Sequence, residues 1–319
     1  MLIVAFGLAY AGWFWREGVI VDRISVLIAG GILLTVSHLG RPWRRWARLG
    51  LEVALYTLMW FAYETTRGLA DGLGFPLQVE SVRNIDRVLF LGADPTVWMQ
   101  RHFYEPSSVR WYDVVASMAY YSHFVVPPAV ILSLWIARHQ RWLAFMRRFA
   151  TLLAFACVSF VVFPTAPPWM AGGGDSIIEL SALPPVVRST GRGWSHIGLR
   201  GFVHAWETAR DWANPVAAMP SLHASFALMI VVYFWDHVRR WWVRGLMALY
   251  PVAMSISLVY LGEHYVADIL GGAILVWASF WIWRRLEAWW HERHGVDPSG
   301  REQFRNEVDP VDIGGSIGQ

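Results

Sequence analysis

Long apolar runs separated by shorter polar segments occupy most of the chain. The runs lie at residues 2–15, 19–37, 49–65, 114–136, 149–163, 217–235, 243–261 and 266–283. A helix that crosses the ~30 Å hydrocarbon core of a bilayer needs about 20 mostly apolar residues, and most of these runs approach that length. The pattern therefore predicts an all-α fold, a polytopic transmembrane helix bundle with eight spans.

The chain divides into three parts on this pattern. Residues 1–48 hold N-terminal transmembrane or peripheral helices, and charged residues at 16, 17, 22 and 23 interrupt them. They form either two short helices or one span followed by a piece in the membrane interface. Residues 49–285 form a six-helix membrane core, and the polar residues 286–319 are expected to be a disordered cytoplasmic tail.

Arginine is unevenly distributed between the polar segments. Residues 38–48, 137–148 and 236–244, and the start of the tail at Arg284 and Arg285, carry arginine with little or no acid. The positive-inside rule places such segments in the cytoplasm. The loops 66–113 and 164–216 mix arginine with acids, so both are expected outside the cytoplasm. The chain is thus predicted to be a multi-pass protein of the plasma (inner) membrane with a cytoplasmic C-terminus.

One stretch of the loop 66–113 is amphipathic. The apolar positions Ile85, Val88, Leu89, Leu91, Val97 and Trp98 are interleaved with Asp86, Arg87 and Asp94. A helix with one apolar and one charged face lies in the plane of a membrane interface, which is the prediction for this stretch.

The composition excludes several other classes of protein. Hydrophobic residues make up 55% and charged residues 16%, which rules out intrinsic disorder. A single cysteine rules out a disulfide scaffold, and 21 tryptophans suit membrane interfaces. The net charge of +3 does not indicate nucleic-acid binding. All 27 basic residues are arginine, a residue that also binds phosphate in a bidentate fork.

Three polar or proline-rich clusters are predicted at the outer ends of the spans. They are residues 164–169 (PTAPPW), 217–223 (AAMPSLH) and 262–268 (GEHYVAD). The predicted topology places all three at one depth and on one side of the membrane. Ionisable residues at such positions are costly and tend to be functional.

His264 and Asp268 have the spacing of an activated nucleophile. Residues four apart share one face of a helix, so the carboxylate can hold one ring nitrogen while the other attacks. His223 follows Pro220 near the start of another predicted helix, where it is placed to protonate a leaving alkoxide. Helix N-termini also favour anions such as phosphate.

Other polar residues have structural alternatives. His123, after Tyr120 inside an apolar run, is as well explained by a structural role as by a functional one. Glu263 is interpreted as a solvated turn residue. Arg188 and Arg192 are either mobile loop charges or a phosphate clamp. Four further histidines are assigned to the membrane surface: His38, His139, His291 and His294.

The three clusters resemble the motifs of a known family, the type 2 phosphatidic acid phosphatase superfamily. The Pro-x-x-Pro-Pro-Trp at 164–169, Ala-Met-Pro-Ser-Leu-His-Ala at 218–224 and Gly-Glu-His-Tyr at 262–265 are most similar to its inositol phosphorylceramide synthase (aureobasidin-resistance) branch and to the bacterial inositolphosphotransferases like it. The similarity is strong over 110–283 and weaker over 49–109. It does not cover the first 48 residues or the tail.

The resemblance implies a six-helix core with an extracytoplasmic catalytic triad. His264 would be the nucleophile that forms a phosphohistidine, Asp268 would orient it, and His223 would be the acid and then the base. It implies no metal and no other cofactor.

The chain departs from the phosphatase pattern in its phosphate-binding cations. It has no lysine and so no Lys-x6-Arg-Pro motif, and the Ser-Arg expected six residues before the nucleophile is Ser257-Leu258. These departures favour the synthase-like branch. Other residues are therefore predicted to bind substrate: Arg188, Arg192, His123, Tyr120, Pro167, Trp169 and Ser221.

Three functions follow from these observations. The first is a membrane lipid phosphotransferase that moves a phosphoryl-headgroup, such as phosphoinositol, from a phospholipid donor to a lipid or glycan alcohol. The second is a lipid phosphate phosphatase with the same triad and water as acceptor. The third is a transporter or lipid-binding membrane protein with His and Asp as a proton relay. The sequence assigns no oligomeric state.

Overall fold

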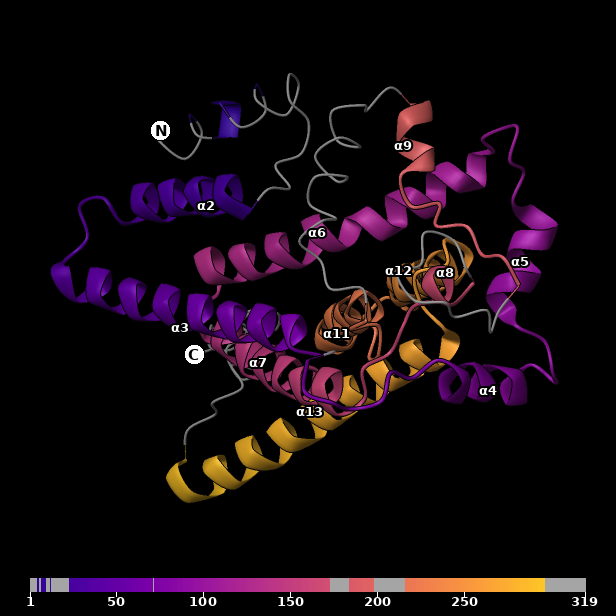
Figure 1. Ribbon diagram of the computed structural model, residues 1–319. Helices are drawn as coiled ribbons and strands as arrows, with labels where there is room; N and C mark the ends of the chain where they lie inside the picture. The colour runs from indigo at the N-terminus through magenta and orange to yellow at the C-terminus, as the bar shows by residue number, and fades with distance from the viewer. Residues whose placement is uncertain are drawn as a thin grey trace, which may run out of the picture.

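The computed structural model describes residues 23–70, 72–172, 184–197 and 216–295, together with five isolated positions before residue 13. The regular elements within these ranges are helices (Figure 1), and the only β-type pairing there is a pair of isolated bridges. The all-α prediction is confirmed.

Four helices within the described ranges are long and apolar enough to cross a membrane. They are α6 (Trp111–Ala137), α7 (His139–Val162), α12 (Trp241–Tyr260) and α13 (Val266–His294). Three more lie on predicted spans: α2 (Arg23–His38), α3 (Trp43–Gly68) and α11 (Leu222–Trp235). The chain is therefore a polytopic helical membrane bundle. The count of eight spans stays a prediction, because most of the first run lies outside the described residues.

Several helices extend beyond the predicted ends of the apolar runs. The arginine-rich segments 38–48 and 137–148 were expected to be loops, but α3 begins at Trp43 and α7 at His139. Arginine is a good helix former, so the helices continue from the apolar core into these charged ends. Likewise α13 continues through 286–294, part of the expected tail, and ends at Gly295 with a left-handed φ of 66°.

Helix α11 lies at the centre of the bundle (Figure 1). On one side its Met229 joins a core formed with Phe160 of α7 and Phe280 of α13. On the other side its Ala227 joins a second cluster with Tyr121 of α6 and Met254 of α12. A helix buried on two sides has little freedom to rotate, and this fixes the direction of every side chain that it carries.

The segments between the spans gather at the end of the bundle where α13 begins (Figure 1). They include α4 (Glu80–Leu89), α5 (Pro95–Phe103), α8 (Pro168–Ala171) and α9 (Arg192–His196). Thr165 forms parallel β-bridges with both Gln78 and Ala217, which ties three distant segments together. The turn at 261–265 and the start of α11 lie at this same end, so the fold brings the three predicted motifs together.

The amphipathic stretch forms α4 and α5 rather than one helix. The break falls at Leu91 and Gly92, whose φ angles of 53° and 94° are incompatible with a continuing right-handed helix. In α4, Val82 and Asp86 are buried, whereas Ile85 and Val88 are exposed. The predicted two-faced character is confirmed, and its acidic face turns inward at Asp86.

A buried ion pair joins α7 to the C-terminal part of α13. Arg148 donates from Nη1 to Glu287 Oε1 at 2.9 Å and from Nη2 to Oε2 at 2.6 Å. Both side chains are buried. This bidentate contact explains why α13 stays helical past the predicted end of its apolar run.

We predict that Glu287→Gln lowers the free energy of unfolding by about 3–5 kcal/mol, because it leaves the Arg148 guanidinium buried without its counter-charge. Thermal unfolding in detergent measures the change. Glu292→Gln, at an exposed position of the same helix, is the control and should leave the midpoint unchanged. A Glu287→Gln variant as stable as the parent would show that the pair contributes nothing.

Candidate active site

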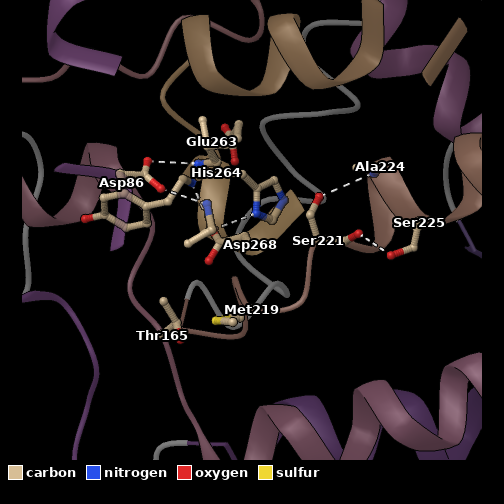
Figure 2. A network of polar contacts seen from close by, with 12 residues as sticks. Asp86, Thr165, Met219, Ser221, Ala224, Ser225, Glu263, His264 and Asp268 are labelled. Carbon is tan, nitrogen blue, oxygen red and sulfur yellow. Dashed lines mark hydrogen bonds and ion pairs between the residues drawn. The ribbon is translucent and has the colours of Figure 1, made fainter. Parts of the chain in front are cut away.

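His264 and Asp268 lie together at the start of α13 (Figure 2). Nδ1 of His264 is 3.2 Å from Oδ2 of Asp268. The imidazole is 6% exposed and the carboxylate is fully buried. The same Oδ2 accepts the backbone N–H of Tyr265 at 2.9 Å, as the acidic residue of a capping box does. Two contacts therefore fix the Asp268 carboxylate against His264.

This geometry prepares the other ring nitrogen for attack. A carboxylate can only accept, so the imidazole presents its Nδ1 proton to Asp268 and keeps the lone pair on Nε2. A buried carboxylate also stabilises an imidazole ring that becomes positively charged. The predicted contact between the two side chains is present in the structure.

His223 stands in the first turn of α11, facing His264 across a ring-centroid distance of 5.6 Å. Ser221 is the N-cap of that helix and accepts the N–H of Ala224 at 3.4 Å. The backbone N–H of Ser221 donates to the carbonyl of Asp268 at 3.0 Å, so the starts of the two helices are bonded directly. Nε2 of His223 is buried and has no hydrogen-bond partner among the described residues.

Two side chains of α6 stack on His223. The Tyr120 ring lies parallel to it at 4.8 Å, and the His123 ring lies at 4.1 Å. Nδ1 of His123 is also buried without a hydrogen-bond partner in the described part of the chain. The structure thus brings both predicted residues, Tyr120 and His123, against His223.

Arg188 is held beside the nucleophile by Glu263. Its Nε donates to Oε1 of Glu263 at 2.5 Å, and its guanidinium lies 4.6 Å from the Trp169 ring centroid. Burial tends to lower the pKa of Arg188, but the Glu263 carboxylate outweighs it and raises the pKa above its ordinary value. The guanidinium therefore stays charged. The interpretation of Glu263 as a solvated residue is wrong, because the ion pair buries it to 8% exposure.

A second cation near His223 was not among the predicted residues. Arg67, in the last turn of α3, interacts electrostatically with both His223 and Tyr120. It lies about 150 residues before His223 and just beyond an apolar run, and nothing in the sequence links it to the motifs. The one feature of the sequence that could have identified Arg67 is its position at the outer end of the predicted span 49–65.

The remaining predicted residues have structural contacts of their own. Arg192 donates to the carbonyls of Glu105 and Ser108, and its Nε lies 3.8 Å from Asp113. Pro167 is the N-cap of α8, and the N–H of Trp169 donates to the carbonyl of Gly262 at 3.0 Å. Substrate binding by Arg192, Pro167 and Ser221 stays a prediction. Within the described ranges, no three His, Cys, Asp or Glu side chains are grouped to hold a metal ion.

Comparison with known proteins gives two matches. The model of the PAP2 superfamily matches residues 81–282. The phosphoinositol dihydroceramide synthase of Bacteroides thetaiotaomicron is 26% identical over 272 residues, which is 81% of this chain and 84% of that protein. No solved structure matches. The matched family region includes α4, His223, His264 and Asp268, whereas Arg67 precedes it.

Close approach of α13 to α11 sets the spacing of the two histidines. A Cβ atom at Gly272 would lie 2.4 Å from Ser225 Oγ and 2.9 Å from the Ser221 carbonyl oxygen. Ser225 is itself bonded to that carbonyl at 2.6 Å (Figure 2), so it cannot simply rotate away. Only glycine allows the helices to approach this closely.

We predict that Gly272→Ala lowers the free energy of unfolding by about 1–3 kcal/mol and reduces activity, since the added methyl group separates the helices that carry His223 and His264. Thermal unfolding and turnover in the same detergent measure both effects. Gly245→Ala on α12, where a Cβ meets nothing within 4 Å, is the control. Equal behaviour of the two variants would contradict the argument.

Proposed function

The chain belongs to the PAP2 superfamily, and from this premise and the site geometry we propose that it transfers phosphoinositol from a phospholipid to a lipid alcohol. The family match and the synthase name of the relative support a membrane-embedded phosphotransferase. The observation that carries the proposal is the buried His264–Asp268 pair facing His223, because it combines an activated nucleophile with an acid–base partner.

The first half-reaction forms a covalent intermediate. Nε2 of His264 attacks the phosphorus of the donor, forming a P–N bond as the bond from phosphorus to the diacylglycerol oxygen breaks. His223, in its protonated form, gives its proton to that leaving oxygen. The products are diacylglycerol and a phosphoinositol group on His264, with Asp268 balancing the positive ring.

The second half-reaction transfers the group. Neutral His223 takes the proton of the acceptor hydroxyl, whose oxygen attacks phosphorus as the P–N bond breaks. His264 returns to its starting form and His223 is again protonated. A water molecule in place of the alcohol would complete hydrolysis by the same steps, so acceptor identity alone separates a transferase from a phosphatase.

Two arginines are proposed to hold the phosphate in place of the cations that the phosphatase pattern supplies. Arg188 and Arg67 interact electrostatically with His223. Arginine matches phosphate oxygens with a rigid fork of donors. Tyr120 and His123 then line the headgroup side, and Trp169 supports Arg188.

The site is proposed to open to the extracytoplasmic side. The arginine-rich segments lie at the ends of α7 and α13 away from the histidines, and the positive-inside rule assigns those ends to the cytoplasm. The grouping of His and Asp at a single end of the bundle also argues against a proton relay, which would run through its depth.

Label transfer tests the function. With headgroup-labelled phosphatidylinositol and dihydroceramide in lipid nanodiscs, we predict label on the ceramide, and a loss of at least about a thousandfold in His264→Ala. A rapid denaturing quench followed by mass spectrometry should detect the adduct on His264. Label released only as inositol phosphate identifies a hydrolase. Absence of any bond cleavage would revive the transporter and lipid-binding alternatives.

Two substitutions test whether Arg67 and Arg188 bind the donor phosphate, one by removing the positive charge and one by changing the shape of the cation. Arg67→Gln removes a cation, and Arg188→Lys keeps the charge beside Glu263 but loses the fork. Each is predicted to raise the donor KM about tenfold, the effect of one charged hydrogen bond. Arg101→Gln, an exposed position on α5, is the control. An unchanged KM in both variants would remove these arginines from the site.

A further inference from the structure

A second carboxylate is buried at the start of α13. Asp86, on the inward face of α4, is 1% exposed. Its Oδ1 accepts the N–H of Ala267 at 2.7 Å, and its Oδ2 accepts the N–H of Val266 at 2.9 Å (Figure 2). A residue from a peripheral helix thus caps the transmembrane helix that begins 180 residues later.

The two carboxylates divide the first N–H groups of α13 between them. The opening N–H groups of a helix have no partner within it. Asp268 accepts the N–H of Tyr265 and holds His264, while Asp86 accepts the next two N–H groups. No other side chain in the described ranges accepts the N–H of Val266 or Ala267.

We propose that Asp86 is a positioning residue of the transferase: by capping α13 it leaves the Asp268 carboxylate to orient His264. This inference rests on the proposed function. Without Asp86, the N–H groups of Val266 and Ala267 lose their acceptor. The Asp268 carboxylate lies at the same helix start, and its Oδ1 is buried without a hydrogen-bond partner in the described part of the chain. Rotation of Asp268 toward them would lengthen its contact with Nδ1 and misalign the nucleophile.

Burial disfavours the charged form of Asp86, and the N–H groups at the start of α13 favour it. Burial raises the pKa of Asp86 to about 6, against the lowering effect of the Val266 and Ala267 N–H groups, and the neighbouring Asp268 and Asp94 raise it further. Arg83, the cation of the same helix, is bonded to Asp94 at 2.8 Å. The other titratable neighbours are Tyr265 and, through Asp268, His264. The positive N-terminal end of α13 therefore stabilises the negative charge of the Asp86 carboxylate.

The test is Asp86→Asn in the full-length protein in nanodiscs, with the label-transfer assay. An amide offers one acceptor in place of two and no charge. We expect kcat to fall about tenfold to a hundredfold, as for a misplaced reacting group, with the donor KM within about twofold. Glu80→Gln, an exposed carboxylate of the same helix, is the matched control.

Two results would overturn the inference: a parental kcat in Asp86→Asn, and a rise in the donor KM alone. If Asp86→Asn does not fold, Asp86→Ser takes its place, since serine caps helices and fits a smaller space. The label-transfer assay on the parent protein and on His264→Ala tests the proposed function without any change at Asp86. A negative result for Asp86→Asn therefore contradicts only the positioning role of Asp86.

Discussion

The buried start of α13 is the constraint on which the site depends. A helix that begins inside a protein exposes N–H groups that water cannot reach, and each must meet an acceptor. Asp268 and Asp86 provide these acceptors, one from the helix itself and one from α4. The same first turn receives the Ser221 N–H at the Asp268 carbonyl. One local requirement for hydrogen bonds thus joins α4, α11 and α13 around the nucleophile.

Packing along the bundle keeps this arrangement in register. α11 is buried on two sides, and the missing side chain at Gly272 lets α13 approach it within reach of Ser225. At the other end the Arg148–Glu287 pair joins α13 to α7. The helix that bears Asp268 and follows His264 is therefore fixed at both ends and along one face.

The two arginines near His223 come from distant parts of the chain. The phosphatase pattern places its arginine near the nucleophile in sequence, but here that position is Leu258. Arg188 arrives from the loop before α9 and Arg67 from the end of α3. Glu263 anchors the former, so a turn residue that is acidic beside a nucleophile serves as the counter-charge of a buried cation rather than as a base.

The sequence by itself determined the helical membrane class and the approximate helices, and it predicted that His223, His264 and Asp268 would come together. Apolar runs and i, i+4 spacing involve residues that are close in sequence, so they can be recognised without the tertiary structure. Only the tertiary structure showed what Asp86, Arg67 and Glu263 contact. Asp86 lies in an amphipathic stretch where an acid is ordinarily solvated, and its contact is with N–H groups 180 residues away. Its role arises from burial of a helix end, and burial depends on how the elements pack.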